Sequence, residues 1–531
     1  MWQQNYTPVG DSLGLSALVA GIPIFVLLLL LGVLRKPAWM AALAGLASAA
    51  IVAAGAYQMP MGALIGSITN GAIFGLVPIG FIVFSAILLY RVSVESGKFE
   101  IIKDSIGGLT SDRNLQALLI AFGFGAFIEG CSGFGSPVAV AAAMLTGLGF
   151  SPFYAAAICL LANTAPVAFG SIGIPVVTLA QVTQLPLDRL SAGVGRICAP
   201  VSLFIPSYLI LVMSGLKGLK SVFPAAAACG ITFAGTQFLV SNYLGPELTD
   251  ILASLASMGA LLVVIRVRGG EERKPSKYTA GEILHAWAPY ALLVIFVLLW
   301  GAKTPFKAWL ASTDIPIQWP GLHNVVQRMP PTVAAPAAYA AVYRFPWLSG
   351  AGTSCLFAAI SAFLVVGMKP GQFLGIVGKT AKQLALAELT LASVLGLAYL
   401  MNYSGATGTL GLAFAATGAA FPFFSALLGW LGVFLTGSDT SANALFGPLQ
   451  TVTATRLGMS DVLMASSNSA AGVMGKMISL TSIAVAAAAT SMKREDEARL
   501  FRFTLRHSIF LTSVMGMVVL FYAYVMPGWA P

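Results

Sequence analysis

The stretch "FIEGCSGFGSPVAVAAAML", from Phe127 to Leu145, interrupts an otherwise apolar part of the chain. It carries a carboxylate at Glu129, three glycines between positions 130 and 135, and a proline at Pro137 that opens a new apolar segment. Glycine permits tight turns, and proline is favoured in the first turn of a helix. The pattern predicts a helical hairpin with an acid close to its turn.

The composition is that of an integral membrane protein. Of 531 residues, 58% are hydrophobic and 9% are charged, whereas soluble domains carry about 25% charged residues. Apolar runs of about twenty residues recur from end to end, and each can cross a hydrocarbon core about 30 Å thick. The first run lacks a basic segment before it, so we expect a retained span rather than a cleaved signal.

Two stretches, 113–149 and 421–457, are each about 37 residues long. That length exceeds a single span of about 20 residues and suits a hairpin that enters and leaves by the same face. We therefore predict an all-α polytopic membrane protein with about twelve transmembrane helices and two re-entrant hairpins. The expected spans are 12–34, 38–57, 61–90, 151–183, 190–214, 219–243, 247–265, 283–301, 350–368, 383–402, 459–490 and 505–526.

The formal net charge is +10, and the basic residues gather in a few loops. In a membrane protein this distribution reflects the positive-inside rule rather than nucleic-acid binding. If neither hairpin crosses the membrane, these loops share one side, which we expect to be the cytoplasm, with both termini external. The loops carry Arg35, Lys36, Arg91, Lys98, Lys103, Arg266, Arg268, Arg273, Lys274, Lys277, Lys369, Lys379, Lys382, Lys493, Arg494, Arg499 and Arg502.

The hairpin pattern recurs in the second half of the chain. "FLTGSDTSANALFGPLQTV", from Phe434 to Val452, aligns with the first stretch and places Gly437 on Gly130 and Asp439 on Ser132. In the orientation above, the first hairpin opens from the cytoplasm and the second from outside, so we predict inverted copies. Inverted repeats with broken helices are typical of secondary transporters, whose substrate sites lie near the midplane at the repeat interface.

An asparagine motif follows each hairpin. "NTAPVAFG" begins at Asn163 and "NSAAGVMG" at Asn468, so the hairpin and the motif recur as a linked pair, shifted by 307 and then 305 residues. Small residues also let membrane helices pack closely, which would explain "SGFGS" alone. It does not explain a paired copy with a charge at each turn.

The repeats suggest a division of the chain. We expect N-terminal helices in 1–60, a first repeat in 61–215, scaffold helices in 216–301, an external loop in 302–349, a helix with a cytoplasmic connector in 350–382, and a second repeat in 383–531.

The hairpin turns and broken helices predict a binding site. Backbone within the membrane depth must be buried in protein or line a watery cavity, and freed N–H groups at a helix start attract anions. The candidate substrate-binding residues are Ser132, Gly133, Phe134, Gly135, Asn163, Ser438, Thr440, Asn443, Asn468 and Lys476.

Ionisable residues inside apolar segments are functional candidates by default. Lys476 lies 17 residues before Lys493, about 25 Å along a helix, which is too far to reach the same surface. We expect Lys476 to hold a substrate carboxylate; the alternative, which can coexist, is a structural ion pair with Asp439 or Glu129.

Glu129 and Asp439 are the candidate proton carriers, in that order. A carboxyl in a low-dielectric pocket can exchange a proton near neutral pH. Asp439 has a competing interpretation as the N-cap of the helix that starts near Thr440. Glu388 is interpreted as a structural partner of Lys382.

No metal or cofactor is expected. The three histidines are far apart, and the five cysteines lie in apolar segments without a C-x-x-C pair, so zinc and disulfides are disfavoured.

Five motifs together resemble the L-lactate permease family over essentially the whole chain: "EGCSGFGSPVA", "NTAPVAFGSIG", "PGLHN", "LTGSDTSANALFG" and "NSAAGVMGKMIS". The resemblance implies proton-coupled lactate uptake, with glycolate handled by close relatives, and an ion-transporter-type fold of inverted repeats. An elevator movement follows only by analogy of fold. Many members carry an acidic or Pro-Gln pairing after "MGKMI", where this chain has Ser479 to Ser482.

We therefore expect a secondary active transporter in the bacterial plasma membrane that moves L-lactate, D-lactate or glycolate with protons. Sodium coupling is an alternative, since both hairpins offer hydroxyl, amide and carbonyl oxygens. A passive channel is another. A membrane-embedded enzyme would need a nucleophile–base or metal grouping, which the sequence does not display. Substrate preference, ion stoichiometry, oligomeric state and the type of movement stay open.

Overall fold

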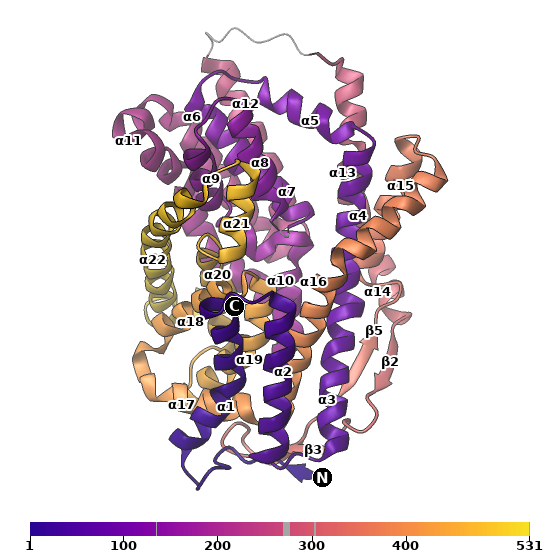
Figure 1. The fold of residues 1–531 in the computed structure, drawn as a ribbon, viewed down its shortest axis with the longest axis vertical. Coiled ribbons are helices and arrows are strands. Elements are labelled where there is room, and N and C mark those ends of the chain that lie inside the picture. Colours follow the sequence, from indigo (N-terminus) through magenta and orange to yellow (C-terminus); the bar gives the residue numbers. More distant parts are fainter. Residues whose placement is uncertain (134, 269–276, 302–303, 530–531) are drawn as a thin grey trace.

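The computed structural model describes residues 1–133, 135–268, 277–301 and 304–529 of a mostly helical protein (Figure 1). Within these ranges, ten helices are long and apolar enough to cross a membrane, or up to twelve if each of two bent helix pairs counts as one span. The predicted class, an all-α polytopic membrane protein with about twelve spans, is confirmed.

The N-terminal region forms three long helical segments. They are α1 (Leu13–Leu28) with the π-helix η1 (Leu29–Val33), α2 (Ala38–Gly55), and the continuous rod of α3 (Met61–Phe74), the π-helix η2 (Gly75–Gly80) and α4 (Phe81–Glu95). The short helix α5 (Lys98–Gly107) follows.

The first hairpin and its broken helix come next. The descending arm consists of α6 (Arg113–Gln116), η3 (Ala117–Phe124) and α7 (Gly125–Cys131), and the returning arm is α8 (Ser136–Gly147). The broken helix comprises α9 (Pro152–Ala162), η4 (Val167–Phe169) and α10 (Gly170–Thr183).

Helix α11 (Leu187–Tyr243) is interrupted at Gly215 and Val222, where the backbone leaves the helical conformation. The predicted boundary between the spans 190–214 and 219–243 lies between these interruptions. Helices α12 (Thr249–Arg268) and α13 (Ala280–Gly301) complete this part of the chain.

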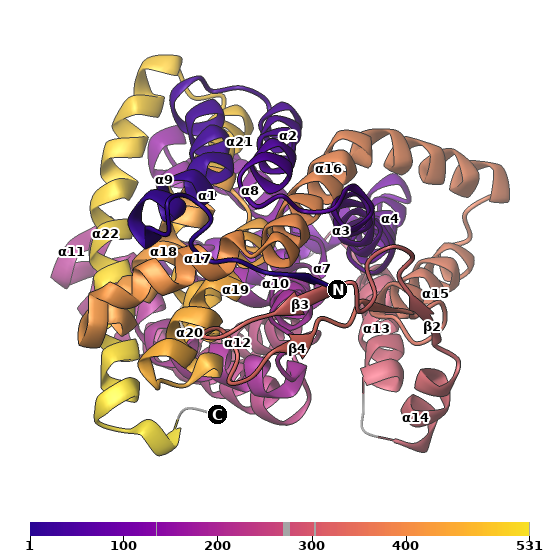
Figure 2. The same ribbon diagram turned by 90° about the horizontal axis from the view of Figure 1, so that it is seen from below.

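The predicted loop 302–349 contains a short helix and small sheets rather than wholly irregular chain. They are α14 (Pro305–Ser312), β2 (Ile315–Gln318), β3 (Val326–Arg328), β4 (Ala337–Ala338) and β5 (Val342–Phe345). β2 pairs antiparallel with β5, and the N-terminal β1 (Trp2–Gln3) pairs parallel with β3. Figure 2 shows the N-terminus beside β3.

The last third contains the second hairpin. Helices α15 (Ala351–Val365), α16 (Pro370–Ser404), α17 (Ala406–Phe414) and η5 (Ala415–Ala420) lead into the hairpin arms α18 (Phe421–Thr436) and α19 (Asp439–Leu457). They are followed by α20 (Asp461–Lys476), α21 (Leu480–Ala489), α22 (Arg494–Tyr524) and η6 (Pro527–Trp529).

Two groups of helices meet along the middle of the molecule. α16 packs against α2, α3 and α4, whereas α18 packs along α20 and α19 packs against α10. The first hairpin lies in the upper half of Figure 1 and the second in the lower half, an arrangement consistent with inverted copies.

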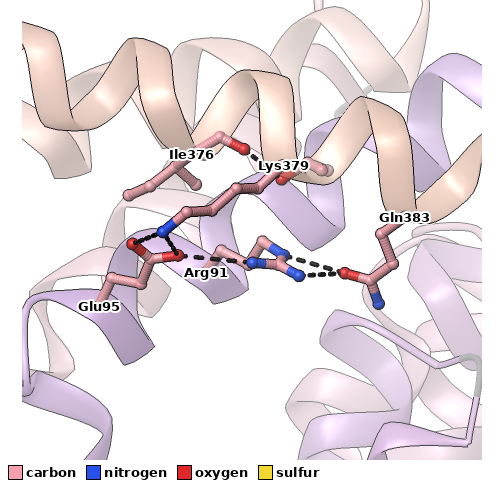
Figure 3. Close-up of polar contacts among 6 residues, drawn as sticks. Arg91, Glu95, Ile376, Lys379 and Gln383 are labelled. Carbon is pink, nitrogen blue, oxygen red and sulfur yellow. Dashed lines mark hydrogen bonds and ion pairs between the residues drawn. The ribbon is translucent and has the colours of Figure 1, made fainter.

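A polar cluster joins α4 to α16 (Figure 3). Glu95 forms ion pairs with Arg91 on its own helix, at 3.4 Å, and with Lys379 on α16, at 3.1 Å. The Arg91 guanidinium also donates to Gln383 Oε1. These contacts link the two helices at one end of the group formed by α2, α3, α4 and α16.

Candidate functional site

The first hairpin closes on itself. The Arg113 Nη2 atom, at the start of the descending arm, donates to the carbonyl oxygen of Gly149, just past the end of the returning arm, at 3.3 Å. Between the arms, Gly133 and Gly135 adopt φ values of 59° and 81°, which glycine tolerates and other residues rarely do. Phe134, a predicted substrate-binding residue, lies outside the described residues.

The second hairpin turns at Gly437, where φ is 72°. The Gln450 Nε2 atom on the returning arm donates to the Ser425 carbonyl oxygen on the first arm at 3.0 Å. The Ser438 side chain accepts from the backbone N–H of Ser441 and is the N-cap of α19. The interpretation of Asp439 as the N-cap is therefore wrong, because Asp439 is already the first helical residue.

The predicted alignment of Gly130 with Gly437 does not hold in three dimensions. Gly437 forms a turn, whereas Gly130 lies inside helix α7. A Cβ atom at Gly130 would lie 3.0 Å from Asp250 Cβ and from the Ile251 nitrogen. This glycine therefore permits α7 to approach α12 closely.

Both helices that follow the hairpins are broken beside a hairpin turn. α9 and α10 are bent by 63°, and α20 and α21 by 40°. At the first break, the Ser171 hydroxyl donates to the Ser132 carbonyl oxygen at 3.1 Å. At the second, a Cβ atom at Gly437 would lie 2.3 Å from Thr481 Oγ1, so the hairpin turn rests directly on the start of α21.

An ion pair joins the first hairpin to the second broken helix. Lys476, the last residue of α20, places its Nζ atom 2.8 Å from Oε1 of Glu129 on α7. The Asn163 side chain donates to the other oxygen of Glu129 at 2.9 Å. Glu129 is 3% exposed and Lys476 12%. Of the two ion-pair partners weighed for Lys476, the structure pairs it with Glu129.

Asp439 belongs to a separate polar network. Its Oδ2 atom accepts from the Ser469 hydroxyl at 2.6 Å, while its Oδ1 atom is buried without a hydrogen bond among the described residues. Asn443 donates to the Pro175 carbonyl oxygen at 3.1 Å and accepts from Asn468 at 2.9 Å. Asn443 therefore connects the second hairpin to α10, and Asn468 connects it to α20.

A cavity of about 320 Å³ lies between the two hairpin turns, the two helix breaks and the facing group of helices. One wall comes from the hairpins and breaks, and the opposite wall from α2, η2, α4 and α16. The first wall consists of Glu129, Gly135, Val167, Gly170, Ser171, Ile174, Pro175, Thr436, Gly437, Ser438, Asp439, Thr440, Ser441, Lys476, Thr481, Ser482 and Val485. The opposite wall consists of Ala38, Ile79, Val83, Ala387, Glu388, Thr390 and Leu391.

Six of the predicted site residues line the cavity, and other predicted residues lie outside its lining. Glu129, Gly135, Ser438, Asp439, Thr440 and Lys476 line it. Ser132, Gly133, Asn163, Asn443 and Asn468 lie outside its lining. Ser132, Asn163 and Asn443 form hydrogen bonds to lining residues. Gly133 lies beside Ser171, and Asn468 donates to Asn443. Ser171, Ser441, Thr481 and Ser482 were missed, because hydroxyls are common in membrane helices and carry no signal of their own.

Glu388 was seen in the sequence but assigned the wrong neighbour. Among the described residues it forms no ion pair with Lys382, and its Oε2 atom is buried without a hydrogen bond. Its carboxylate instead packs over Gly80, where a Cβ atom would lie 2.0 Å from Oε2. The sequence signal that could have marked Glu388 as a cavity residue was its position as an acid in an otherwise apolar stretch of α16.

Arg196 lies away from this cavity. Its Nε atom donates to Asn242 at 2.8 Å, and its guanidinium carbon lies 5.3 Å from the centre of the Trp529 ring. These contacts fasten the C-terminal segment to α11.

A helical membrane protein with a charged cavity between two hairpin turns and two broken helices has the architecture of a secondary transporter. The family model for L-lactate permease matches residues 16–526. The chain belongs to the L-lactate permease family.

Two permeases with similar sequences support this assignment. The chain is 43% identical to the L-lactate permease of Escherichia coli (strain K12), covering 100% of both chains, and 43% identical to the glycolate permease GlcA of the same strain, covering 99% of both. The solved structure of Neisseria gonorrhoeae MtrF, titled as one of a class of antimetabolite efflux pumps, has a TM-score of 0.45 at 14% identity, covering 86% of this chain and 83% of that one. The relatives are named permeases, and this chain is a transporter, not an enzyme.

Proposed function

We propose that this chain takes up L-lactate and related 2-hydroxy monocarboxylates, including D-lactate and glycolate, together with protons across the bacterial plasma membrane. The observation that carries the proposal is the Lys476–Glu129 ion pair, which joins the two repeats at the cavity. The relatives named L-lactate permease and glycolate permease support the substrate class.

The substrate carboxylate binds to Lys476 and to the start of α19. Among the residues that line the cavity, Lys476 is the one cation. The start of α19, at Ser438 and Thr440, lines the same space, and helix N-termini attract anions. The hydroxyl of Ser171 on the facing break is a partner for the substrate hydroxyl.

Charge balance links the substrate to a proton. In the empty cavity Lys476 is paired with Glu129. When a substrate carboxylate takes Lys476, Glu129 loses its counter-charge, and a buried unpaired carboxylate is strongly disfavoured. Glu129 therefore binds a proton as the monocarboxylate binds, which keeps this group of charges neutral in both states. Asp439 is the second candidate for carrying a proton.

The remaining predicted residues hold this arrangement in place. Asn163 orients Glu129, while Asn443 and Asn468 support the second hairpin. We retain the predicted division into two repeats, 61–215 and 383–531, with re-entrant hairpins at 113–149 and 421–457, and cytoplasmic basic loops with external termini.

Uptake by the purified full chain in sealed proteoliposomes tests the proposal. We expect an inward proton gradient to drive accumulation of L-lactate above its external concentration without added sodium. Sodium coupling is the second candidate, favoured by the unpartnered Oδ1 atom of Asp439, and it would be supported if accumulation required a sodium gradient at fixed pH. Equilibration without accumulation would indicate a passive channel instead.

A further inference from the structure

The cavity wall that α2, η2, α4 and α16 form is apolar except for two residues. Ala38, Ile79, Val83, Ala387 and Leu391 are joined there by Thr390 and Glu388. Glu388 is the one ionisable residue that the described part of this wall contributes. Its position is set by Gly80, because any side chain there would collide with the carboxylate.

The cavity lining carries more acidic than basic side chains. Lys476 is the single cation among the lining residues, against the carboxyl groups of Glu129, Asp439 and Glu388. Glu129 is satisfied by Lys476 and Asn163, and Asp439 by Ser469 on one oxygen. No ion pair neutralises Glu388 among the described residues, and its side chain, unlike that of the buried Glu129, is partly exposed among the residues that line the cavity.

Size does not explain selection of a small monocarboxylate. The cavity has a volume of about 320 Å³, and pockets from about 300 Å³ upward bury drug-sized ligands. A four-carbon dicarboxylate such as L-malate, which is lactate with its methyl group replaced by a carboxymethyl group, has room to fit. With Lys476 holding the first carboxylate, the lining offers the second carboxylate a further acid, Glu388, and no second cation.

We propose that Glu388 is a specificity-determining residue that excludes dicarboxylates from the cavity. This inference rests on the proposed function. Its physical basis is that like charges across a partly dry cavity repel, and that specificity often depends on a repulsive element directed at the wrong ligand. A monocarboxylate avoids this repulsion because it carries no second charged group.

Competition in proteoliposomes tests this role. Uptake of labelled L-lactate is measured against unlabelled L-malate, glycolate and D-lactate for the wild type and for Glu388→Gln and Glu388→Lys. We expect L-malate to inhibit each variant at a concentration at least tenfold lower than the wild type, with labelled L-malate taken up by Glu388→Lys. Inhibition by glycolate should change by less than threefold.

The matched control is Lys382→Gln, which removes a charge from the same helix outside the cavity. It should retain the exclusion of L-malate. If a variant loses lactate uptake, stabilisation of the detergent-purified protein against heat by L-malate, relative to L-lactate, gives the same comparison without transport. Unchanged exclusion of L-malate in both Glu388 variants would overturn the inference alone, whereas absence of lactate and glycolate uptake by the wild type would overturn the proposed function.

Discussion

Lys476 and Glu129 lie 347 positions apart in the chain, yet their charged atoms are 2.8 Å apart where the first hairpin meets the second broken helix. Each residue terminates or nearly terminates a helix beside a break: Lys476 ends α20, and Glu129 lies in the last turns of α7. The pair therefore connects the conformation of the first hairpin to that of the second broken helix.

Replacing the cation should abolish transport. In Lys476→Ala we expect at least a hundredfold loss of L-lactate uptake, because the substrate carboxylate loses its counter-charge. Leaving Glu129 buried and unpaired should also destabilise the protein by about 3–5 kcal/mol. The double variant Lys476→Gln with Glu129→Gln should recover the thermal stability without recovering transport. Uptake of normal affinity by Lys476→Ala would remove Lys476 from the site.

Replacing Glu129 alone should preserve binding of L-lactate but abolish its coupling to protons. Glu129→Gln keeps the shape of the side chain but cannot exchange a proton. We expect it to retain exchange of internal for external L-lactate while losing accumulation driven by a pH gradient. Glu100→Gln, at an exposed side chain of α5, is the control with the same chemistry. Persistent proton-driven accumulation by Glu129→Gln would place the coupling proton elsewhere.

Close helix packing beside Lys476 should be sensitive to a single methyl group. A Cβ atom at Gly475 would lie 2.3 Å from the Trp430 carbonyl oxygen, a backbone atom that cannot turn aside. We expect Gly475→Ala to lower the free energy of unfolding by about 1–3 kcal/mol or more, the usual cost of overpacking. Gly259→Ala, in helix α12 where nothing lies within 4 Å of the new atom, should be neutral or slightly stabilising. Thermal unfolding in detergent compares the two, and equal midpoints would contradict the packing of α18 against α20.

The polar cluster between α4 and α16 should matter little by comparison. Glu95, with a side chain 32% exposed, pairs with Arg91 and Lys379, which are 26% and 61% exposed. Exposed ion pairs contribute about 0–1 kcal/mol. We expect Glu95→Gln to shift stability by less than about 1 kcal/mol and to leave L-lactate uptake unchanged. A severe transport defect would show that the spacing of α4 and α16 depends on this cluster.

The hairpins and broken helices could be predicted because their signals are local. Glycine pairs, prolines and stranded charges mark a turn within a few residues, and the repeated order of the motifs reinforces them. The pairing of Lys476 with Glu129 rather than Asp439 depends on how two distant helix ends approach, and no local pattern encodes that approach. From the sequence alone, Glu129 and Asp439 are equally suitable partners for Lys476. Only packing distinguishes them, because it places Asn163 beside Glu129 and Ser469 beside Asp439.

Glu388 illustrates the limit most clearly. On one helix, spacing from Lys382 permits a contact, so a sequence argument naturally pairs the two. The structure turns the carboxylate toward Gly80 on a different helix, and the space for it exists only because that residue lacks a side chain. A rule based on neighbours along one helix cannot detect room provided by another.

The parallel pairing of β1 with β3 bears on the order in which this molecule is assembled. Gln3 bonds to Gln327, which lies 324 positions later, and Gln4 donates to the carbonyl oxygens of Asn402 and Tyr403. A growing polypeptide emerges from its first residue onward, so this leading segment must wait, unpartnered, until most of the bundle has been synthesised. The N-terminal segment therefore docks late in assembly, and it connects parts of the chain that are already inserted in the membrane.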